Sequence, residues 1–420
     1  MKMDKNLHIP QGYRQTEVGV IPDDWEVVRL SQIGNVIGGG TPDTENGEYW
    51  NDDIYWFTPT EIKQKYINKS VRKISKKGLQ KSSAKILSKN TLLLTTRATI
   101  GDIGIALNEC STNQGFQSIF VNEKNSYMYI YYWILNNRNE LIKRSSGSTF
   151  LEISKREIEK IQLIRPPKQE QQKIADILTT WDNAINQQTT LIEKKQQLKK
   201  GLMQQLLTAK TRFSEFSDDW EIVKLNNIGI TYNGLTKKTA IDFQNGSYKY
   251  IAYMNIFSNS KINTLISDFV QIQLNENQNK VQYGDIFFTT SSETPEEVGM
   301  SSVLLEDIEN TYLNSFCFAY RLNNFDTLLP EFAQFYFRSF FVRYEILRLA
   351  QGSTRFNISK KEVLKIKILL PSVREQQKIA QVLTLADDEI TKLQTELVLL
   401  KIQKKGLMQQ LLTGKIRIKI

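Results

Sequence analysis

Histidine is almost absent from the sequence: His8 is the only one, which excludes histidine-based catalytic triads and histidine-rich metal sites. The two cysteines, Cys110 and Cys317, stand alone, without the paired spacing of a disulfide or zinc site. No apolar run approaches the roughly 18 residues of a membrane span, and the N-terminal lysines precede no apolar signal segment. We therefore expect a soluble, reduced, cytoplasmic protein.

Other enzyme motifs are also missing. The glycines at Gly38–Gly40 lack the strand–GxGxxG–helix context of a dinucleotide site, and no GxxxxGK[ST] motif is present. No Asn/Asp-Pro-Pro-Tyr motif is available to hold a flipped adenine for methylation. We expect structural roles for the acidic pairs Asp52–Asp53, Asp218–Asp219 and Asp387–Asp388. The sequence predicts a protein that binds rather than converts, with no catalytic residue and no metal site.

The sequence does contain a long internal repeat. Glu170–Leu178 returns as Glu375–Leu383 with seven of nine residues identical, and Lys199–Arg212 returns as Lys404–Arg417 with twelve of fourteen identical. Both pairs are offset by 205 residues, so nothing was inserted between them. Solenoid repeats run roughly 20–50 residues, far shorter than this period. The chain is a duplicated domain-plus-helix unit.

Shorter repeats frame each half. Asp23–Leu30 returns as Asp218–Leu225 at an offset of 195, and two short segments return at the offset of 205. Those segments are Gly147–Thr149 with Ile153–Lys155, and Gly352–Thr354 with Ile358–Lys360. Between the repeats, residues 30–141 and 225–343 barely resemble each other. Divergent inserts in one frame indicate that each recognises a different target; drift after duplication would have blurred the helical segments as well.

The repeated segments are predicted to be long helices, because proline precedes each one and apolar residues then step by four and three. This spacing is typical of a coiled-coil seam, and two helices of about 40 residues would each extend about 60 Å. We expect them to pair antiparallel. The predicted seam consists of Ile174, Leu178, Trp181, Ile185, Ile192, Leu202 and Leu206 with Ile379, Leu383, Ala386, Ile390, Leu393, Leu397, Leu400, Leu407 and Leu411, and the first helix also places polar Gln188, Lys195 and Lys199 on it.

The net charge of +10 is concentrated on these helices. Residues 168–212 hold eight Lys/Arg against four Asp/Glu, and residues 374–420 hold nine against five, which together leaves only +2 for the rest. Basic charge favours a nucleic-acid partner through phosphate contacts and counterion release. A lysine-rich solvated helix face is the alternative explanation.

The inserts are predicted to mix strands and helices. Short apolar or β-branched runs are typical of strands, and longer stretches rich in aromatic residues are typical of helices. The predicted strands are Thr91–Thr96, Ser118–Val121, Asp285–Thr290 and Ser301–Leu305, and the predicted helices are Tyr127–Lys143 and Glu331–Leu349.

Taken together, these segments resemble the specificity (S) subunit of type I DNA restriction–modification systems. The residues that carry the resemblance are the frames Ile153–Ala175 and Ile358–Ala380, the openings Asp23–Trp25 and Asp218–Trp220, and Gly-Leu-Met-Gln-Gln-Leu-Leu at the end of each helix. The resemblance covers residues 10 to 417, and every motif occurs twice. Polar residues on the seam of the first helix are a mild departure from the pattern.

The resemblance implies an α+β fold with two globular target-recognition domains separated by two long helices that pair as an antiparallel coiled coil. The domains would be an N-terminal lead, partly disordered (1–22), target-recognition domain 1 (23–165), helical spacer 1 (166–212), target-recognition domain 2 (213–371) and helical spacer 2 (372–420). The chain would be a non-catalytic reader of a bipartite target in double-stranded DNA. Two modification (methyltransferase) subunits would dock on the helices, and restriction subunits would complete the complex. S-adenosylmethionine, ATP and Mg²⁺ would belong to those partners, and this chain would bind no cofactor.

Side chains that bond to base edges or phosphates should lie on the inserts. The candidates are Thr41, Thr95, Thr96, Arg97, Gln114, Ser146, Ser148, Thr149 and Lys155 in the first half, and Lys237, Lys238, Thr289, Thr290, Ser291, Ser292, Gln351, Ser353, Thr354, Arg355 and Lys360 in the second. Because Gly-Ser-Thr is common to both halves, it should touch backbone or fix a turn rather than read sequence. A capped loop or satisfied hydroxyl is the alternative for each candidate, and for Arg97 a salt bridge to Asp102 or a phosphate contact.

Two rival functions remain open at the level of sequence. One is a DNA-modifying or DNA-cutting enzyme with an unrecognised active site. The other is a coiled-coil scaffold that never touches nucleic acid.

Overall fold

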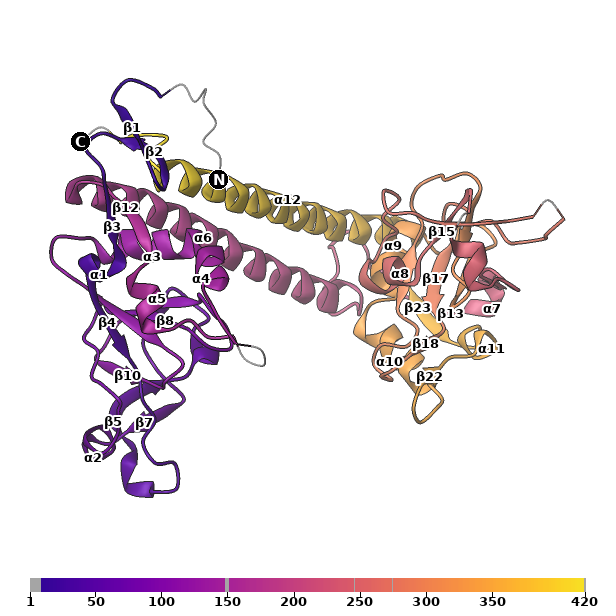
Figure 1. Ribbon diagram of the computed structural model, residues 1–420. Coiled ribbons are helices and arrows are strands. Elements are labelled where there is room, and N and C mark those ends of the chain that lie inside the picture. The colour runs from indigo at the N-terminus through magenta and orange to yellow at the C-terminus, as the bar shows by residue number, and fades with distance from the viewer. Residues whose placement is uncertain (1–8, 148–150, 245, 274, 419–420) are drawn as a thin grey trace. The chain divides into compact units, whose positions relative to one another are not determined.

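The computed structural model describes residues 9–147, 151–244, 246–273 and 275–418 (Figure 1). The chain divides into two compact units, one formed by Met1–Thr189 with Glu396–Ile420 and the other by Thr190–Thr395. Each unit contains one of the divergent inserts and part of both long helices. His8 lies outside the described residues.

The first unit begins with a hairpin, β1 (Tyr13–Thr16) and β2 (Gly19–Pro22), within the predicted N-terminal lead. Its larger sheets have the strand orders β4-β11-β8-β9-β6 and β10-β5-β7, and β3 pairs with β12. The remaining strands are β3 (Glu26–Arg29), β4 (Gly34–Gly38), β5 (Trp50–Phe57), β6 (Tyr66–Ile67), β7 (Arg72–Ile74), β8 (Leu92–Leu94), β9 (Ile103–Ala106), β10 (Cys110–Thr112), β11 (Gln117–Val121) and β12 (Gln162–Arg165). The short helices are α1 (Leu30–Ile33), α2 (Lys76–Gln80), α3 (Tyr127–Asn136), α4 (Arg138–Lys143) and α5 (Lys155–Glu159).

The second unit has sheets ordered β14-β21-β17-β19 and β16-β15-β20, with the pairs β13-β23 and β18-β22. Its strands are β13 (Glu221–Lys224), β14 (Gly229–Asn233), β15 (Tyr248–Ile251), β16 (Asp268–Val270), β17 (Ile286–Thr289), β18 (Ser291–Ser292), β19 (Ser301–Val303), β20 (Thr311–Leu313), β21 (Cys317–Leu322), β22 (Phe356–Asn357) and β23 (Lys367–Leu370). Its short helices are α7 (Leu225–Ile228), α8 (Tyr253–Ser258), α9 (Pro330–Tyr336), α10 (Phe340–Arg348) and α11 (Lys360–Val363).

The two units share one plan. In each, the strand that opens the half pairs antiparallel with the strand that precedes the long helix, with Val28 opposite Leu163 in one unit and Val223 opposite Ile368 in the other. The four predicted strands are present with slightly different bounds. The predicted α+β fold and its duplication are confirmed.

Both long helical predictions within the inserts are wrong in one respect, because each is interrupted. Asn137 ends α3 with φ −108° and ψ 22°, and its side-chain amide donates to the carbonyl of Trp133 at 2.8 Å. In the second unit Ser339 caps α10, accepting from the amide of Val342 at 3.5 Å. Asparagine and serine compete with helical hydrogen bonds in this way, which favours a helix end.

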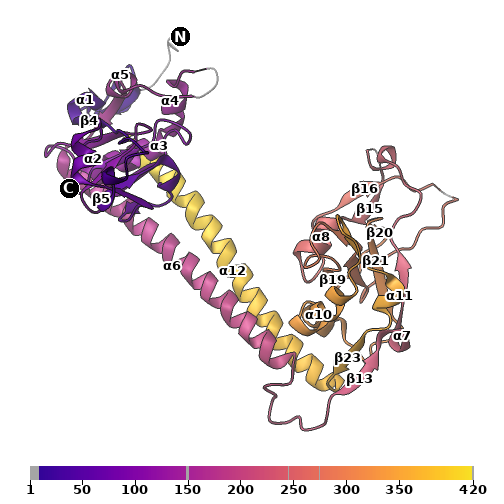
Figure 2. The ribbon, with the colours of Figure 1, turned by 90° about the horizontal axis from the view of Figure 1, so that it is seen from below.

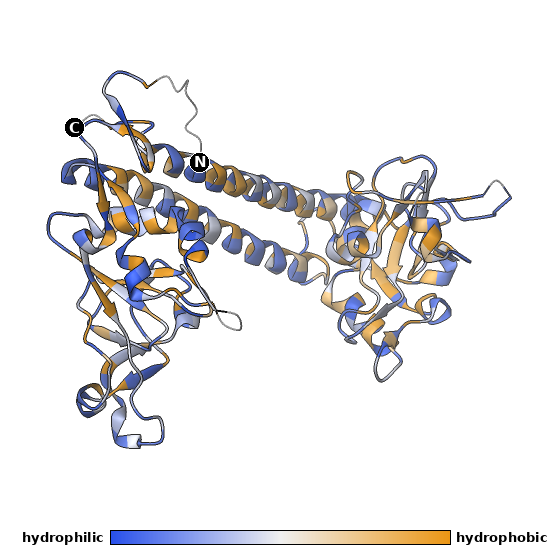
Figure 3. Ribbon diagram, in the orientation of Figure 1, coloured by the Kyte–Doolittle hydropathy of each residue, from blue (hydrophilic) through white to orange (hydrophobic). Residues whose placement is uncertain are grey.

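Each long helix contributes to the core of a globular domain. Many strands of each domain are coloured as hydrophobic (Figure 3), and the buried residues of each domain are mostly apolar. In the first unit Leu178 of one helix and Leu411 of the other belong to a single buried cluster. In the second unit Leu206 and Leu383 do the same. The start of one helix and the end of the other therefore complete each core.

The long helices are α6 (Lys168–Leu206) and α12 (Val373–Leu411), each of 39 residues. Within each unit they lie side by side in both views (Figures 1 and 2). In the first unit Asp182 pairs with Lys404, and Gln188 donates to Glu396 at 3.1 Å. As the residue number rises along α6, that of its partner on α12 falls. The predicted antiparallel pairing is therefore confirmed.

The polar residues on the predicted seam are satisfied across the helix pair. In the second unit Lys195 lies 2.6 Å from Glu389, and Lys199 pairs with Asp387. The Lys199–Asp387 pair is the image, at the offset of 205, of the pair between Lys404 and Asp182. None of the predicted apolar seam residues is exposed. Acidic residues on α12 thus allow α6 to carry polar seam positions.

A buried carboxylate near the start of each long helix is held by an arginine that follows the other. Glu170 accepts two bonds from Arg417 at 2.9 Å and one from the indole of Trp25 at 3.0 Å. Glu375 accepts the corresponding bonds from Arg212 at 2.9 and 2.8 Å. Both carboxylates are almost fully buried, with side-chain exposures of 0% and 1%.

The glutamine that follows each carboxylate is bonded in the same manner in both units. Gln171 accepts from the amide of Ser126 and donates to the carbonyl of Pro166, both at 2.9 Å. Gln376 accepts from the amide of Leu329 and donates to the carbonyl of Pro371, also at 2.9 Å. The first two residues of each repeated Glu-Gln-Gln-Lys segment therefore have the same structural role in both units.

Replacing Ile390 with aspartate should destabilise the second unit. Ile390 is 7% exposed, and an unpaired buried charge costs about 3 kcal/mol or more. Thermal unfolding of the full chain measures the effect, with Leu385→Asp as the control because Leu385 is 63% exposed on the same helix. Equal unfolding temperatures for wild type and Ile390→Asp would refute the seam assignment.

Replacing Gly406 with alanine should stabilise the protein. Nothing lies within 4 Å of a Cβ added at Gly201 or Gly406, so close helix approach does not require either glycine. Alanine within a helix is favoured over glycine by roughly 0.5–1 kcal/mol. Urea denaturation of the full chain should show this gain for Gly406→Ala and again for Gly201→Ala. A loss in either variant would contradict the open environment.

Candidate nucleic-acid interface

In the first unit, two loops meet beside the end of β8. The amide of Ile153 donates to the carbonyl of Thr96 at 3.3 Å, and the backbone of Arg97 bridges that of Glu152. Ser146 and Glu152 exchange backbone hydrogen bonds at 2.9 Å in both directions. Ser146 is therefore joined to Glu152, and Glu152 and Ile153 are joined to the turn after β8.

The second unit repeats this arrangement. The amide of Ile358 donates to the carbonyl of Thr290 at 3.0 Å, and Gln351 and Asn357 exchange backbone bonds at 2.9 and 2.8 Å. Gln351 and Asn357 stand 205 residues after Ser146 and Glu152. The adjoining strands β18 and β22 add pairing between Ser292 and Phe356. The same pair of backbone hydrogen bonds is thus present in both units.

A third turn joins each arrangement. The amide of Thr96 donates to the carbonyl of Gly115 at 2.8 Å, and that of Thr290 donates to the carbonyl of Phe316 at 2.9 Å. Next to Gly115, Gln114 accepts a hydrogen bond from the hydroxyl of Thr41. We name the surface formed by these three segments, together with Thr41 in the first unit, the loop face. It comprises Thr41, Thr96–Arg97, Gln114–Gly115 and Ser146–Gly147 in the first unit, and Thr290–Ser292, Phe316 and Gln351–Phe356 in the second.

The backbone conformation explains the glycine of the Gly-Ser-Thr repeat. Gly147 has φ 126° and Gly352 has φ 133°, in the region that side chains rarely adopt. A Cβ on Gly352 would lie 2.1 Å from the carbonyl oxygen of Arg355. These angles agree with the prediction that the motif fixes a turn. Ser148 and Thr149 lie outside the described residues.

Several predicted DNA contacts are used internally instead. Thr95 and Thr289 are fully buried, and their hydroxyls bond the turns that follow: Thr95 donates to Thr99 at 2.5 Å, and Thr289 accepts from Met300 at 3.0 Å. Thr96 is fully buried as well, and its hydroxyl has no hydrogen-bond partner in the described structure. Their burial therefore argues against the predicted base or phosphate contacts of Thr95, Thr96 and Thr289.

The predicted contact of Lys238 is also opposed by its surroundings. Its side chain is 2% exposed, and its amino group donates to the carbonyl of Gln271 at 2.6 Å and to Glu276 at 2.7 Å. Lys360 is half-buried and donates to the side chain of Asn233. Lys155 keeps half of its side chain exposed beside Glu159 at 3.6 Å. Of these three lysines, Lys155 is the one best placed to reach a phosphate.

The remaining candidates are accessible to solvent. Thr41, Thr290, Ser291 and Ser292 are half-buried, and the rest are exposed: Arg97, Gln114, Ser146, Lys237, Gln351, Ser353, Thr354 and Arg355. Lys237, like Ala98, adopts a positive φ that is uncommon for a residue with a side chain. The exposed candidates of the first unit lie on its loop face, as do all those of the second except Lys237.

The expected salt bridge between Arg97 and Asp102 is wrong. Arg97 pairs with Glu152 at 2.8 Å, and Asp102 pairs with Arg138, also at 2.8 Å. The side chain of Arg97 remains 45% exposed beside its partner. Arg97 is thus oriented by Glu152 on the loop face while keeping donors available to a ligand.

Among the exposed side chains of the loop face, sequence reasoning missed that of Phe316. It is 62% exposed in the turn between β20 and β21. Its counterpart in the first unit is Gly115, because both carbonyls accept from the threonine that follows the end of a strand. The correspondence is hidden in the sequence since its offset is 201, between the two offsets of the frame.

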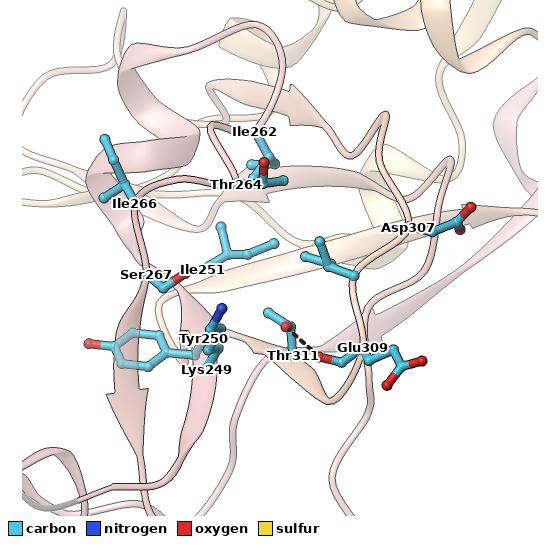
Figure 4. A pocket seen from close by; sticks show the side chains of 11 residues that line it. Lys249, Tyr250, Ile251, Ile262, Thr264, Ile266, Ser267, Asp307, Glu309 and Thr311 are labelled. Atoms are coloured by element: carbon cyan, nitrogen blue, oxygen red, sulfur yellow. Dashed lines mark hydrogen bonds between the residues drawn. The ribbon is translucent and has the colours of Figure 1, made fainter.

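A pocket of about 350 Å³ in the second unit is lined by no loop-face residue (Figure 4). Lys249, Asp307 and Glu309 line it, and the hydroxyl of Thr311 donates to the carbonyl of Glu309 at 2.9 Å. Two carboxylates against one lysine disfavour a phosphate ligand.

The described residues contain no group of three or more His, Cys, Asp or Glu placed to hold a metal ion. Burial raises the pKa of the Cys110 thiol to about 12 and also raises the pKa of the Cys317 thiol. Both thiols are therefore protonated near neutral pH and poor nucleophiles. In the part of the chain that is described, no helix is long and apolar enough to cross a membrane.

Comparison with known proteins supports the resemblance. The family described as type I restriction modification DNA specificity domain matches residues 22–199 and 217–400. The MjaIX specificity subunit of Methanocaldococcus jannaschii is 28% identical over 430 residues, covering 97% of this chain and 96% of that subunit. The EcoR124I/EcoR124II specificity subunit of Escherichia coli is 26% identical over 170 residues, covering 39% and 42%.

Solved structures share the fold. The type I restriction–modification S subunit from M. genitalium superposes with a TM-score of 0.56 at 16% identity, covering 97% of this chain and 98% of that one. A structure from a study of assembly and conformational transition of the type I system gives a TM-score of 0.60 at 15% identity, covering 94% and 99%.

Proposed function

The chain belongs to the family of type I restriction–modification DNA specificity domains, and from this premise we propose that each unit reads one part of a split DNA target through its loop face. The observation that carries the proposal is the repetition of one backbone arrangement with different exposed side chains. Arg97 and Gln114 stand on the loop face of the first unit, and Ser291, Phe316 and Arg355 on that of the second.

This division suits a reader of two different half-targets. The loop frame depends on backbone bonds between Thr96 and Gly115 or Ile153 and on their counterparts, so it does not depend on the exposed side chains. Arginine can bond guanine at O6 and N7, and glutamine can bond adenine at N6 and N7. Contacts from Lys155 to phosphate would position the unit without reading sequence.

In this proposal the chain is the non-catalytic subunit of a larger complex that acts in the cytoplasm, where we place its DNA target. Two modification subunits dock on the helix pair and supply S-adenosylmethionine, and restriction subunits supply ATP- and Mg²⁺-dependent cleavage. Exposed apolar side chains on the helices, such as Leu198 at 58% and Ile402 at 61%, support partner docking. Methyl transfer or cleavage by the purified chain, given DNA with S-adenosylmethionine or Mg²⁺, would contradict the non-catalytic assignment.

Exchanging residues 30–141 for the matching region of another such subunit should change one part of the target and leave the other intact. That segment contains Thr41, Arg97 and Gln114 but none of the loop-face residues of the second unit. Mapping modified adenines genome-wide in cells that carry the chimaera measures both parts. A change in both parts, or in neither, would show that the units do not read independently.

Replacing Arg97 with alanine should weaken cognate binding and relax the preference at one base pair of the first part. The loss expected for one bidentate contact is about 1–3 kcal/mol of discrimination. Affinity of the assembled methyltransferase is measured on the cognate duplex and on duplexes changed singly in that part.

Lys155→Ala is the matched control. It should weaken all duplexes equally and reduce the salt slope by about one unit, as loss of a phosphate contact does. The same uniform behaviour in Arg97→Ala would assign Arg97 to phosphate. Unchanged binding in Arg97→Ala would remove it from the interface.

A further inference from the structure

Phe316 presents an aromatic ring from a rigid turn on the loop face of the second unit. Its amide donates to the side chain of Asn314 at 2.8 Å, and its carbonyl accepts from the amide of Thr290 at 2.9 Å. Both backbone groups are therefore fixed, although the residue is 62% exposed. Single exposed apolar side chains are common on protein surfaces, so the exposure of Phe316 alone does not indicate a binding role. The position of Phe316 on the loop face is the relevant observation.

The first unit excludes a side chain at the same place. Gly115 donates to the side chain of Asn113 at 2.9 Å and accepts from Thr96 at 2.8 Å, just as Phe316 does with its own neighbours. A Cβ on Gly115 would lie 2.7 Å from Cγ of Pro59. The ring therefore belongs to the variable side chains of the loop face and not to the shared frame.

Apart from Phe356, which is half-buried against the core of the unit, the remaining side chains near Phe316 on the loop face are polar. Ser291 and Ser292 follow Thr290 directly, and Ser292 pairs with Phe356, the neighbour of Arg355. Hydroxyl and guanidinium groups can bond the polar edges of bases. A phenyl ring cannot, so within this set it can distinguish bases only by apolar contact.

We propose that Phe316 is a specificity-determining residue whose ring contacts the C5-methyl group of a thymine in the part of the target read by the second unit. This inference rests on the proposed function. The thymine methyl is the one apolar group among the distinctive features that base pairs present in the major groove. Burying a single methyl group corresponds to about a four-fold change in affinity.

The test replaces each thymine of the second part, one at a time, with deoxyuridine, which removes only the methyl group. Binding by the assembled modification complex is measured for each duplex. Wild type should lose about four-fold at one position. Phe316→Ala should bind the cognate duplex more weakly and show no further loss from deoxyuridine there. Phe316→Leu, which keeps an apolar contact, should retain part of the sensitivity.

Phe340→Ala is the matched control, because Phe340 is 80% exposed on α10 of the same unit. It should keep the wild-type response to deoxyuridine at every position. Thermal unfolding of all variants confirms that the second unit is folded in each of them.

Three outcomes would overturn the inference. They are a second part without any A·T pair, an unchanged deoxyuridine loss in Phe316→Ala, and a uniform weakening on all duplexes, which a wedge inserted between base steps would cause. Failure of the proposed function would give a different result, because the wild-type complex would then not prefer the cognate duplex over a scrambled one. Preserved preference with an unchanged deoxyuridine profile overturns the role of Phe316 alone.

Discussion

The buried carboxylate near the start of each long helix is the constraint on which the architecture of each unit depends. Glu170 and Glu375 are removed from water, and an unpaired charge in such a place costs several kcal/mol. Each unit therefore requires the arginine that follows the other long helix, Arg417 in one and Arg212 in the other. The hydrogen bonds that Arg417 donates to Glu170 raise the pKa of Arg417, so this partner stays charged. Each ion pair joins the start of one long helix to the segment that follows the other, and this holds the helix pair in register while the inserts vary.

The units differ where the frame permits it. In the first unit Lys65 joins the pair formed by Asp182 and Lys404 at 3.0 Å, and Tyr132 donates to the same carboxylate at 2.5 Å. Burial lowers the pKa of Lys65, and although burial would raise the pKa of Asp182, its hydrogen bonds from Lys404 and Tyr132 bring that pKa below its usual value. In the second unit Lys199 lies 5.5 Å from the ring centre of Phe335, as Lys404 lies 5.4 Å from that of Tyr132, but a phenyl ring has no hydroxyl to donate to the carboxylate. The ion pair is common to both units, whereas the neighbouring residues come from the inserts and differ between the units.

How much could be predicted from the sequence follows from what each feature depends on. The helix pair and the opening strands depend on periodicity and on repeated motifs, which a sequence displays directly. The roles of side chains depend on burial in the folded protein. In the sequence, Thr95 and Thr289 look like threonines of a protein surface, yet their strands end inside the fold. The partner of Arg97 could not be predicted because Glu152 reaches it only when the loop from Ser146 closes. Phe316 was missed because different loop lengths in the two inserts shift its counterpart out of register.

In the proposed function, the loop face separates stability from recognition, as a reader of varied targets requires. Its turns are held by amide-to-carbonyl bonds, as from Thr96 to Gly115 and from Thr290 to Phe316, and by glycines with positive φ such as Gly352. None of these bonds uses the side chain of an exposed loop-face residue. In the proposed function, a substitution at Arg355 or Phe316 would therefore alter which base is preferred at little cost to the free energy of folding. Where a hydroxyl does hold a turn, as Thr289 holds the amide of Met300, substitution would destabilise that turn. Buried threonines such as Thr95 and Thr289 thus support the loop face, and the exposed residues that differ between the units are the ones proposed to recognise DNA.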